Sequence, residues 1–364
     1  MRLLIPILAL LVRCFVAEAA VPHVAARSVT QIADGVYVII HKDVSDSWPH
    51  SNTTVIIGDR GVFVVDACFL VGAAKEDIAE IRKLTPKPVR YLLNTHWHID
   101  HNAGNQAYIE AFPGLEIISH IATRRIMNAK NPGVAANWGD PHGPLEKEIA
   151  DLKAALAANK GEGGKPLSAE DIADTKQEIR NREVQMSDFQ TFRYQPPTLT
   201  FDRSLTLDFG NREIEIRNLG RATTDGDAFV FLPKERILIT GDLVVSPVPY
   251  TGGSYPSEWR DTLRALVAMN PAVVVPGHGA IARDTVYMQE VIALLDSVIS
   301  QVTAQLPAMR PVPLAQFKVS SLKVDVERFR KSMAGDDPER KIWFDSMVPL
   351  TLVKLAYQEA IGAH

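Results

Sequence analysis

The feature that most constrains this chain is a dense cluster of metal-binding side chains at positions 96–101. The cluster contains His96, His98, Asp100 and His101. Neutral imidazole is the commonest metal ligand in proteins, and a carboxylate oxygen, which is a harder ligand, often binds the same ion. If the segment begins extended, His96 and His98 point the same way and the other two follow a turn. The spacing therefore predicts a centre for one or two metal ions.

The cluster directly follows a predicted buried strand. Positions 89–93 read Val-Arg-Tyr-Leu-Leu, and earlier apolar runs at 36–40, 53–57 and 62–65 are bounded by turn residues. Between them, the apolar spacing at 73–84 predicts a helix. Ligands on a loop after a strand are typical of a rigid scaffold that presents its chemistry at one edge.

The remaining elements are predicted from the same signals. Strands are expected at 115–119, 199–201, 205–207, 213–216, 228–232, 237–240 and 273–275. Helices are expected at 103–112, 121–130, 257–269, 285–306, 324–333 and 342–361. This order predicts an α/β (α+β) fold, an αββα four-layer sandwich of two mixed sheets flanked by helices.

The stretch at about 145–190 differs from its surroundings because it is charged and rich in alanine. It predicts a helical hairpin insertion, with helices at 145–159 and 169–186 separated by glycines. Ser168 is expected to cap the second helix, with Asp171 three residues on. The hairpin is either a solvated decoration, a lid over the metal centre, or a surface for a homo-oligomer.

The two ends of the chain are expected to lie outside the main domain at 20–308. Residues 1–19 have the short basic start, apolar run and small-residue cleavage pattern of a signal peptide, which predicts a secreted or periplasmic protein. The apolar run is well below the ~20 residues of a membrane span. Residues 309–364 predict a C-terminal helical extension. Cys14 leaves with the signal, so Cys68 is expected to be a small buried hydrophobe without a disulfide partner.

The net charge of −4 gives no electrostatic case for nucleic acid or an anionic membrane as a partner. A small-molecule substrate is expected instead.

Three segments of the chain resemble the metallo-β-lactamase superfamily of hydrolases. They are the His96-x-His98-x-Asp100-His101 cluster, Gly241-Asp242 after a strand, and Pro276-Gly277-His278-Gly279. Their order and strand context agree with the family over roughly positions 36–295. The resemblance implies two zinc ions: His96 and His98 on the first, and Asp100, His101 and His278 on the second. Asp242 would bridge them, as in glyoxalase-II-like members.

One position departs from the family pattern. Thr223 stands where the resemblance implies a third histidine for the first metal. A neutral hydroxyl is a poor zinc ligand beside imidazole. The second site is therefore expected to fill at lower metal concentration. Asp225, His50 and His142 are the other groups considered for the missing ligand, and each is expected to be solvated instead.

The expected function is that of a zinc-dependent hydrolase. A metal-bound hydroxide would cleave an ester, lactone, thioester or amide, and Asp100 would both bind metal and carry the proton. Tyr250 and Tyr255 are candidates to contact substrate. Asp66, at the end of its strand, is expected either to accept a hydrogen bond from a ligand imidazole or to shape a turn.

Two alternatives remain open at the level of sequence. Loss of a ligand at Thr223 is compatible with a metal-binding protein that has weak or no turnover. An iron-dependent oxygenase is less favoured. The di-iron relatives replace the second histidine, here retained as His98, and the single-iron relatives need the histidine replaced by Thr223.

Overall fold

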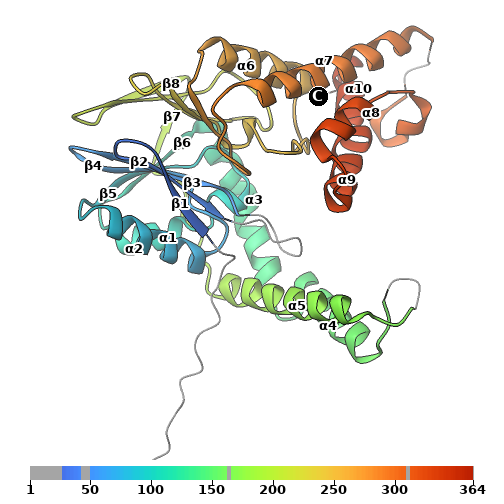
Figure 1. Cartoon of the computed structure of the whole chain (residues 1–364), viewed down its shortest axis with the longest axis horizontal. Coiled ribbons are helices and arrows are strands. Elements are labelled where there is room, and N and C mark those ends of the chain that lie inside the picture. The colour runs from blue at the N-terminus through green and yellow to red at the C-terminus, as the bar shows by residue number, and fades with distance from the viewer. Residues whose placement is uncertain (1–26, 42–49, 162–164, 309–311, 364) are drawn as a thin grey trace, which may run out of the picture.

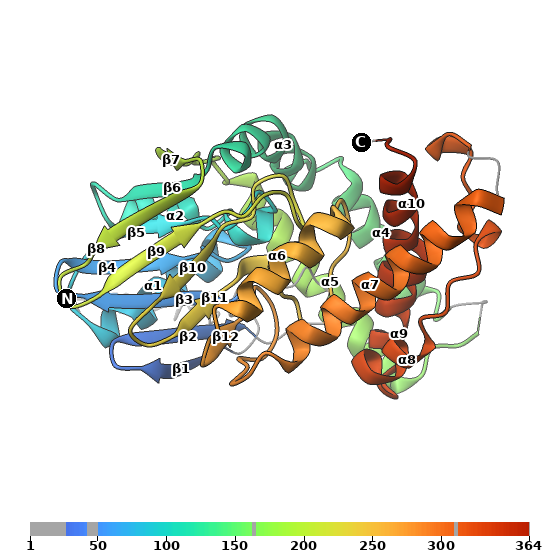
Figure 2. The same ribbon diagram turned by 90° about the horizontal axis from the view of Figure 1, so that it is seen from above.

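The computed structural model describes residues 27–41, 50–161, 165–308 and 312–363, so the expected signal peptide at 1–19 lies outside the described residues. A seven-stranded and a five-stranded sheet face each other, and helices cover the outer face of each (Figures 1 and 2). This arrangement confirms the predicted αββα sandwich of two mixed sheets. In the described ranges no helix combines the length and the apolar character needed to cross a membrane.

The first sheet runs in the order β1 to β7. Its strands are β1 (Arg27–Ala33), β2 (Val36–His41), β3 (Thr53–Gly58), β4 (Gly61–Val65), β5 (Val89–Leu93), β6 (Glu116–His120) and β7 (Leu199–Phe201). Pairing is antiparallel from β1 to β4 and parallel from β4 to β7. Strand β1 was not predicted, because its polar residues lie on a partly exposed edge and show no apolar alternation.

Strand β4 shows why this sheet lies between two layers. Phe63 and Val65 join the core between the sheets, whereas Val62 and Val64 pack under two outer helices. These helices are α1 (Val71–Leu84) and α2 (Asn105–Ala111). A strand buried on both faces reads as a continuous apolar run, as this one does.

The second sheet has the order β12-β11-β10-β9-β8. Its strands are β8 (Ser204–Asp208), β9 (Glu213–Arg217), β10 (Phe229–Leu232), β11 (Ile237–Ile239) and β12 (Val273–Val275). Only β11 and β12 pair in parallel. The outer face packs against α6 (Pro256–Ala268) and α7 (Val286–Gln305), with the buried Trp259 in this core.

The middle helices are α3 (Ile121–Gly139), α4 (Pro144–Ala157) and α5 (Ala169–Gln190). The prediction that α3 ends at position 130 was wrong, because the helix continues through Pro132. Ser168 and Asp171 form the expected capping box at the start of α5. In Figure 1, α4 and α5 project away from the sheets.

The C-terminal segment packs against α7 rather than standing apart, since Phe344, Leu352 and Tyr357 share its apolar core. Its elements are α8 (Glu327–Phe329), a π turn (Arg330–Ala334), α9 (Pro338–Asp345), a second π turn (Ser346–Leu352) and α10 (Val353–Ala360). The expected helix over 342–361 is present, since α9, the second π turn and α10 follow one another without a gap from 338 to 360. Pro349, which has no backbone N–H to donate, lies within the π turn.

Candidate metal centre

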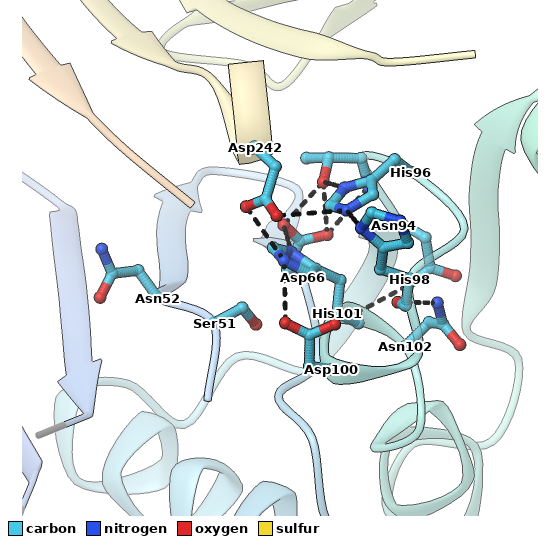
Figure 3. A network of polar contacts seen from close by, with 12 residues as sticks. Ser51, Asn52, Asp66, Asn94, His96, His98, Asp100, His101, Asn102 and Asp242 are labelled. Carbon is cyan, nitrogen blue, oxygen red and sulfur yellow. Dashed lines mark hydrogen bonds and ion pairs between the residues drawn. The ribbon is translucent and has the colours of Figure 1, made fainter. Parts of the chain in front are cut away.

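The six predicted ligands converge at one edge of the sandwich, although they come from three separate segments. His96, His98, Asp100 and His101 follow β5, with the last two in the 3₁₀ turn Ile99–His101. Asp242 lies in the 3₁₀ turn Gly241–Leu243 after β11, and His278 lies on the loop after β12. Figure 3 shows Asp242 pointing from the second sheet toward the imidazoles of the segment that follows β5.

The side chains form two groups, each with its ligand atoms within 4.8 Å of one another. In the first group, His96 Nε2 lies 2.9 Å from His98 Nδ1, and Asp242 is the third member. The second group consists of Asp100, His101 and His278. Here the Nε2 atoms of the two histidines are 3.1 Å apart, and His278 Nε2 is 3.1 Å from Asp100 Oδ2.

Asp242 lies between the two groups and presents one oxygen to each. Its Oδ2 is 3.5 Å from His96 Nε2, and its Oδ1 is 3.2 Å from His101 Nε2. Oδ1 is buried and has no hydrogen-bond partner among the residues that the structure describes. A buried, unsatisfied carboxylate oxygen facing imidazole nitrogens needs a further partner, and a shared metal ion fits this donor set.

The electrostatics of the two groups differ. Burial and the neighbouring His96 lower the pKa of His98 to about 3, which keeps its imidazole neutral. Burial opposes protonation of His101, but the carboxylates of Asp242 and Asp66 outweigh it and raise its pKa well above the usual value. Burial also opposes protonation of His278, but the carboxylates of Asp242 and Asp100 raise its pKa. The second group therefore lies in the more negative field, which attracts protons or a metal cation.

Both carboxylates of the centre are held ionised. Burial alone would raise their pKa values, but His101 and His278 lower the pKa of Asp100 and of Asp242 well below the usual range. Ionised oxygen is the form that binds metal.

Asp66 makes the expected contact with a ligand imidazole. Its Oδ2 accepts from His101 Nδ1 at 2.8 Å, and its Oδ1 accepts from the Thr95 backbone N–H at 2.9 Å. Because Nδ1 is engaged in this way, His101 directs Nε2 toward the second group. The neighbouring Thr95 Oγ1 lies 3.0 Å from His96 Nδ1, so both groups are braced from the same turn.

Asn52 supports the loop that carries His278, a role that no local pattern in the sequence predicts. Its side-chain amide donates to the carbonyl oxygens of Pro276 and Gly279, each at 3.0 Å. Its backbone N–H donates to the Gly277 carbonyl at 2.7 Å. A side chain at Gly277 would collide with the Asp242 carboxylate, so this approach requires glycine.

Thr223 is buried and donates to Asp227 Oδ1 at 2.5 Å. Asp227 was missed by sequence reasoning, although it lies in the same segment; burial raises its pKa, with His96 opposing. It falls outside both ligand groups. Asp225 accepts from the Tyr255 hydroxyl at 3.1 Å.

His142 and His50, which were both expected to be solvated, differ in their exposure. His142 is exposed, as predicted. The prediction that His50 is solvated was wrong: its side chain is buried, with Nδ1 2.8 Å from the Cys68 sulfur.

Aromatic side chains line one side of the first group. The Tyr250 ring lies 5.4 Å from the His98 ring and stacks at 6.2 Å on Trp343 of α9. Trp97 packs beside His98, with ring centroids 4.4 Å apart. Tyr255 donates its hydroxyl to Asp225. Trp343 was missed because its contact with Tyr250 spans distant parts of the chain.

Comparison with known proteins agrees with this geometry. Residues 46–278, more than half of the chain, match the family model described as the metallo-beta-lactamase superfamily. The chain belongs to this superfamily. The two groups of potential metal ligands lie within or at the end of the matched residues.

Among curated relatives, the linear primary-alkylsulfatase of Pseudomonas sp. (strain ATCC 19151) is 23% identical over 260 residues. The match covers 69% of this chain but 46% of the relative, so the chain spans about half of that protein's length.

Two solved structures show the extent of the shared fold. A metallo-beta-lactamase from Pontibacter korlensis has a TM-score of 0.53 at 17% identity, covering 74% of this chain and 99% of its own. A double mutant of the sec-alkyl sulfatase PisA1 has a TM-score of 0.59 at 13% identity, covering 93% of this chain and 51% of its own.

Proposed function

We propose that the protein is a zinc-dependent hydrolase that cleaves an ester, lactone, thioester or amide in a small molecule. The observation that carries this proposal is the position of Asp242, which offers one oxygen to each ligand group. His96, His98 and Asp242 would hold one zinc ion, and the group of Asp100, His101 and His278 would hold another with Asp242. Bound zinc would lower the pKa of water toward neutrality and polarise the scissile bond.

The two zinc positions are proposed to fill unequally. The first group has two imidazoles and a shared carboxylate, since Thr223 is engaged with Asp227 instead. The second group has two imidazoles, its own carboxylate and the share of Asp242. Zinc titration followed by native mass spectrometry tests this. We expect a tight first equivalent and a weaker second one, and two equally tight equivalents would contradict the proposal.

Asp100 is proposed to act in proton transfer as well as in binding zinc. Its lowered pKa means that it begins the cycle ionised. Any proton that it carries is therefore one that it receives from the attacking water, and it then delivers that proton to the leaving group.

The substrate is proposed to have an apolar part that rests against Tyr250 and Trp343. The stacked pair lies beside His98, and Trp343 remains 42% exposed, which leaves ring surface available. Tyr255 would contact only a longer substrate, because its hydroxyl is engaged by Asp225.

A sulfate ester of an apolar alcohol is a second candidate substrate. The alkylsulfatase fold matches 93% of the chain, and this share is large enough to include part of the C-terminal segment that carries Trp343. The β-lactamase fold covers 74%. The alcohol part of a sulfate ester would rest on the same apolar surface. Its cleavage would require attack by water at the sulfur atom or at the adjoining carbon.

An activity panel with and without added zinc tests the reaction class. It should contain an aryl ester, a lactone, a thioester, a β-lactam and a long-chain alkyl sulfate. We expect zinc-dependent turnover of at least one substrate, and its loss in Asp100→Ala. Absence of turnover with both positions filled would favour a metal-binding protein. Oxygen consumption by an iron-loaded sample would favour an oxygenase.

We further propose that the mature protein is secreted or periplasmic, from the signal-like residues 1–19. Cell fractionation with N-terminal sequencing of the mature chain tests this. A homo-oligomer through α4 and α5 stays a prediction, which analytical ultracentrifugation of the full chain would check.

A further inference from the structure

A second cluster of metal-binding side chains lies on the helix side of the first sheet. His41 ends β2, Cys68 follows β4, and Asp77 lies in α1. All three are buried, with at most 4% of their surface exposed. Their candidate ligand atoms all lie within 4.8 Å of one another. The cluster shares no residue with the hydrolytic centre.

The distances suit a single ion. His41 Nε2 lies 3.0 Å from Asp77 Oδ1 and 3.8 Å from Cys68 Sγ. Ligand atoms in the hydrolytic centre are 2.9 to 3.5 Å apart. The longer separation to sulfur is expected, because zinc–sulfur bonds of about 2.3 Å exceed zinc–nitrogen bonds of about 2.0–2.1 Å.

The orientation of His41 repeats that of His101. Its Nδ1 lies 2.8 Å from the Ser51 carbonyl oxygen, which can only accept, so Nδ1 carries the hydrogen. The Nε2 atom faces Cys68 and Asp77, and a metal ion there would replace the proton that Nε2 donates to the Asp77 carboxylate. Metal-binding histidines are commonly held in this way by a carbonyl or carboxylate on the other ring nitrogen.

Charged groups also surround the cluster. Arg27 pairs with the buried Asp77 and with the partly exposed Glu76. Burial opposes ionisation of Cys68, but His41 and His50 outweigh it and lower its pKa to about 6.

His50 contacts the Cys68 sulfur but is not one of the three candidate ligands. Its Nδ1 lies 2.8 Å from Cys68 Sγ, which is close enough for a hydrogen bond and too close for both atoms to ligate one ion. It therefore stabilises the thiolate as an outer partner.

Two hydroxyl groups near the cluster lack partners. Ser51 Oγ and the Tyr108 hydroxyl are buried, and neither has a hydrogen-bond partner within the described part of the chain. Ser51 supplies the carbonyl that holds His41. Burial, and after it the charges of Asp77 and Cys68, raise the pKa of Tyr108. Buried hydroxyls are normally satisfied by protein groups or by ordered water.

We propose that His41, Cys68 and Asp77 bind a structural zinc ion, at a site separate from the hydrolytic centre. The ion would join β2, the loop after β4 and helix α1. The same loop carries Asp66, whose carboxylate orients His101. Cys68 is thus a metal ligand rather than only a small buried hydrophobe.

Cobalt substitution tests this, because Cys68 and Cys14 are the only two cysteines and the hydrolytic centre contains none. Loading the full chain with Co²⁺ should give a thiolate-to-cobalt charge-transfer band in the near-ultraviolet. The band should persist in Cys14→Ser and in His101→Ala. It should vanish in Cys68→Ser, which should also bind one fewer metal ion per chain by mass spectrometry.

The wild-type spectrum decides the matter even if a variant misfolds. A fully loaded wild-type protein without the band would overturn the proposal, as would equal metal content in wild type and a folded Cys68→Ser. Hydrolytic activity does not enter these readings, so failure of the proposed function would leave the outcome unaffected.

Discussion

The two ligand groups of the hydrolytic centre use similar side chains but are supported differently. In the second group, His101 is anchored by Asp66, and the loop of His278 is held by Asn52. In the first group, His98 is only half-buried, and the position of the family's third histidine is occupied by Thr223. Because the contacts behind its ligands are more complete, we expect the second group to bind metal more tightly than the first.

Removing the ligand common to both groups should have the largest effect. We expect Asp242→Ala to lower kcat/KM by about 10³-fold or more, because several kcal/mol of charge stabilisation are lost. Metal content should fall in the same sample. The exposed Asp208, which pairs with Arg60, offers a matched control as Asp208→Ala. Activity of Asp242→Ala within tenfold of wild type would show that the groups act without a shared carboxylate.

Weakening the support of the second group should have an intermediate effect. We expect Asp66→Asn to lower zinc affinity or activity by about 10–100-fold, the usual cost of losing an outer partner of a ligand histidine. The loss should appear in the tightly bound equivalent. Competition with a chromophoric chelator measures it, and a loss confined to the weaker equivalent would reverse the assignment of the two groups.

Completing the first group should reduce the difference between the groups. We expect Thr223→His to tighten binding of the weaker equivalent of zinc, which is assigned to the first group, by about tenfold. The reason is that an imidazole replaces a hydroxyl, which is a poor zinc ligand. Calorimetric titration compares this variant with Thr223→Val, which removes the hydroxyl without adding a ligand. Identical isotherms for the two variants would show that position 223 does not face the metal.

The smallest effect concerns the N-terminal cap of α3. His120 caps α3, where its Nδ1 accepts from the Ala122 N–H at 3.3 Å, and burial lowers its pKa. The unfolded chain therefore binds the proton more readily, so stability falls as pH drops through about 6.5. Protonation would also remove the acceptor.

His120→Asn keeps a capping acceptor but does not titrate. We expect the wild type to lose at most about 1 kcal/mol more than this variant between pH 7.5 and 5.5, as measured by urea unfolding. If the free energies of unfolding of the two proteins change in parallel with pH, His120 does not cause the loss of stability.

Local signals explain what was predictable from the sequence. The run at 89–93 and the ligand cluster at 96–101 are adjacent, so one strand brings four ligands to the same edge of the sheet. The capping box of Ser168 and Asp171 is equally local. The π turn around Pro349 was not predicted, because the apolar spacing there is that of a regular helix.

Contacts between distant segments explain what was not predictable. Asn52 reaches residues more than two hundred positions away, and Trp343 meets Tyr250 only because the C-terminal segment packs on α7. The burial of His50 follows from its contact with Cys68.

The sequence by itself determined the superfamily, the four-layer sandwich and the set of six converging ligands, because strand periodicity and short motifs act over a few residues. Only the tertiary structure decided how those ligands divide around Asp242, and which of them are braced. It also brought His41, Cys68 and Asp77 together. The physical reason is that the separation of side chains from different strands and helices is set by sheet pairing and core packing, which spacing along the chain does not encode.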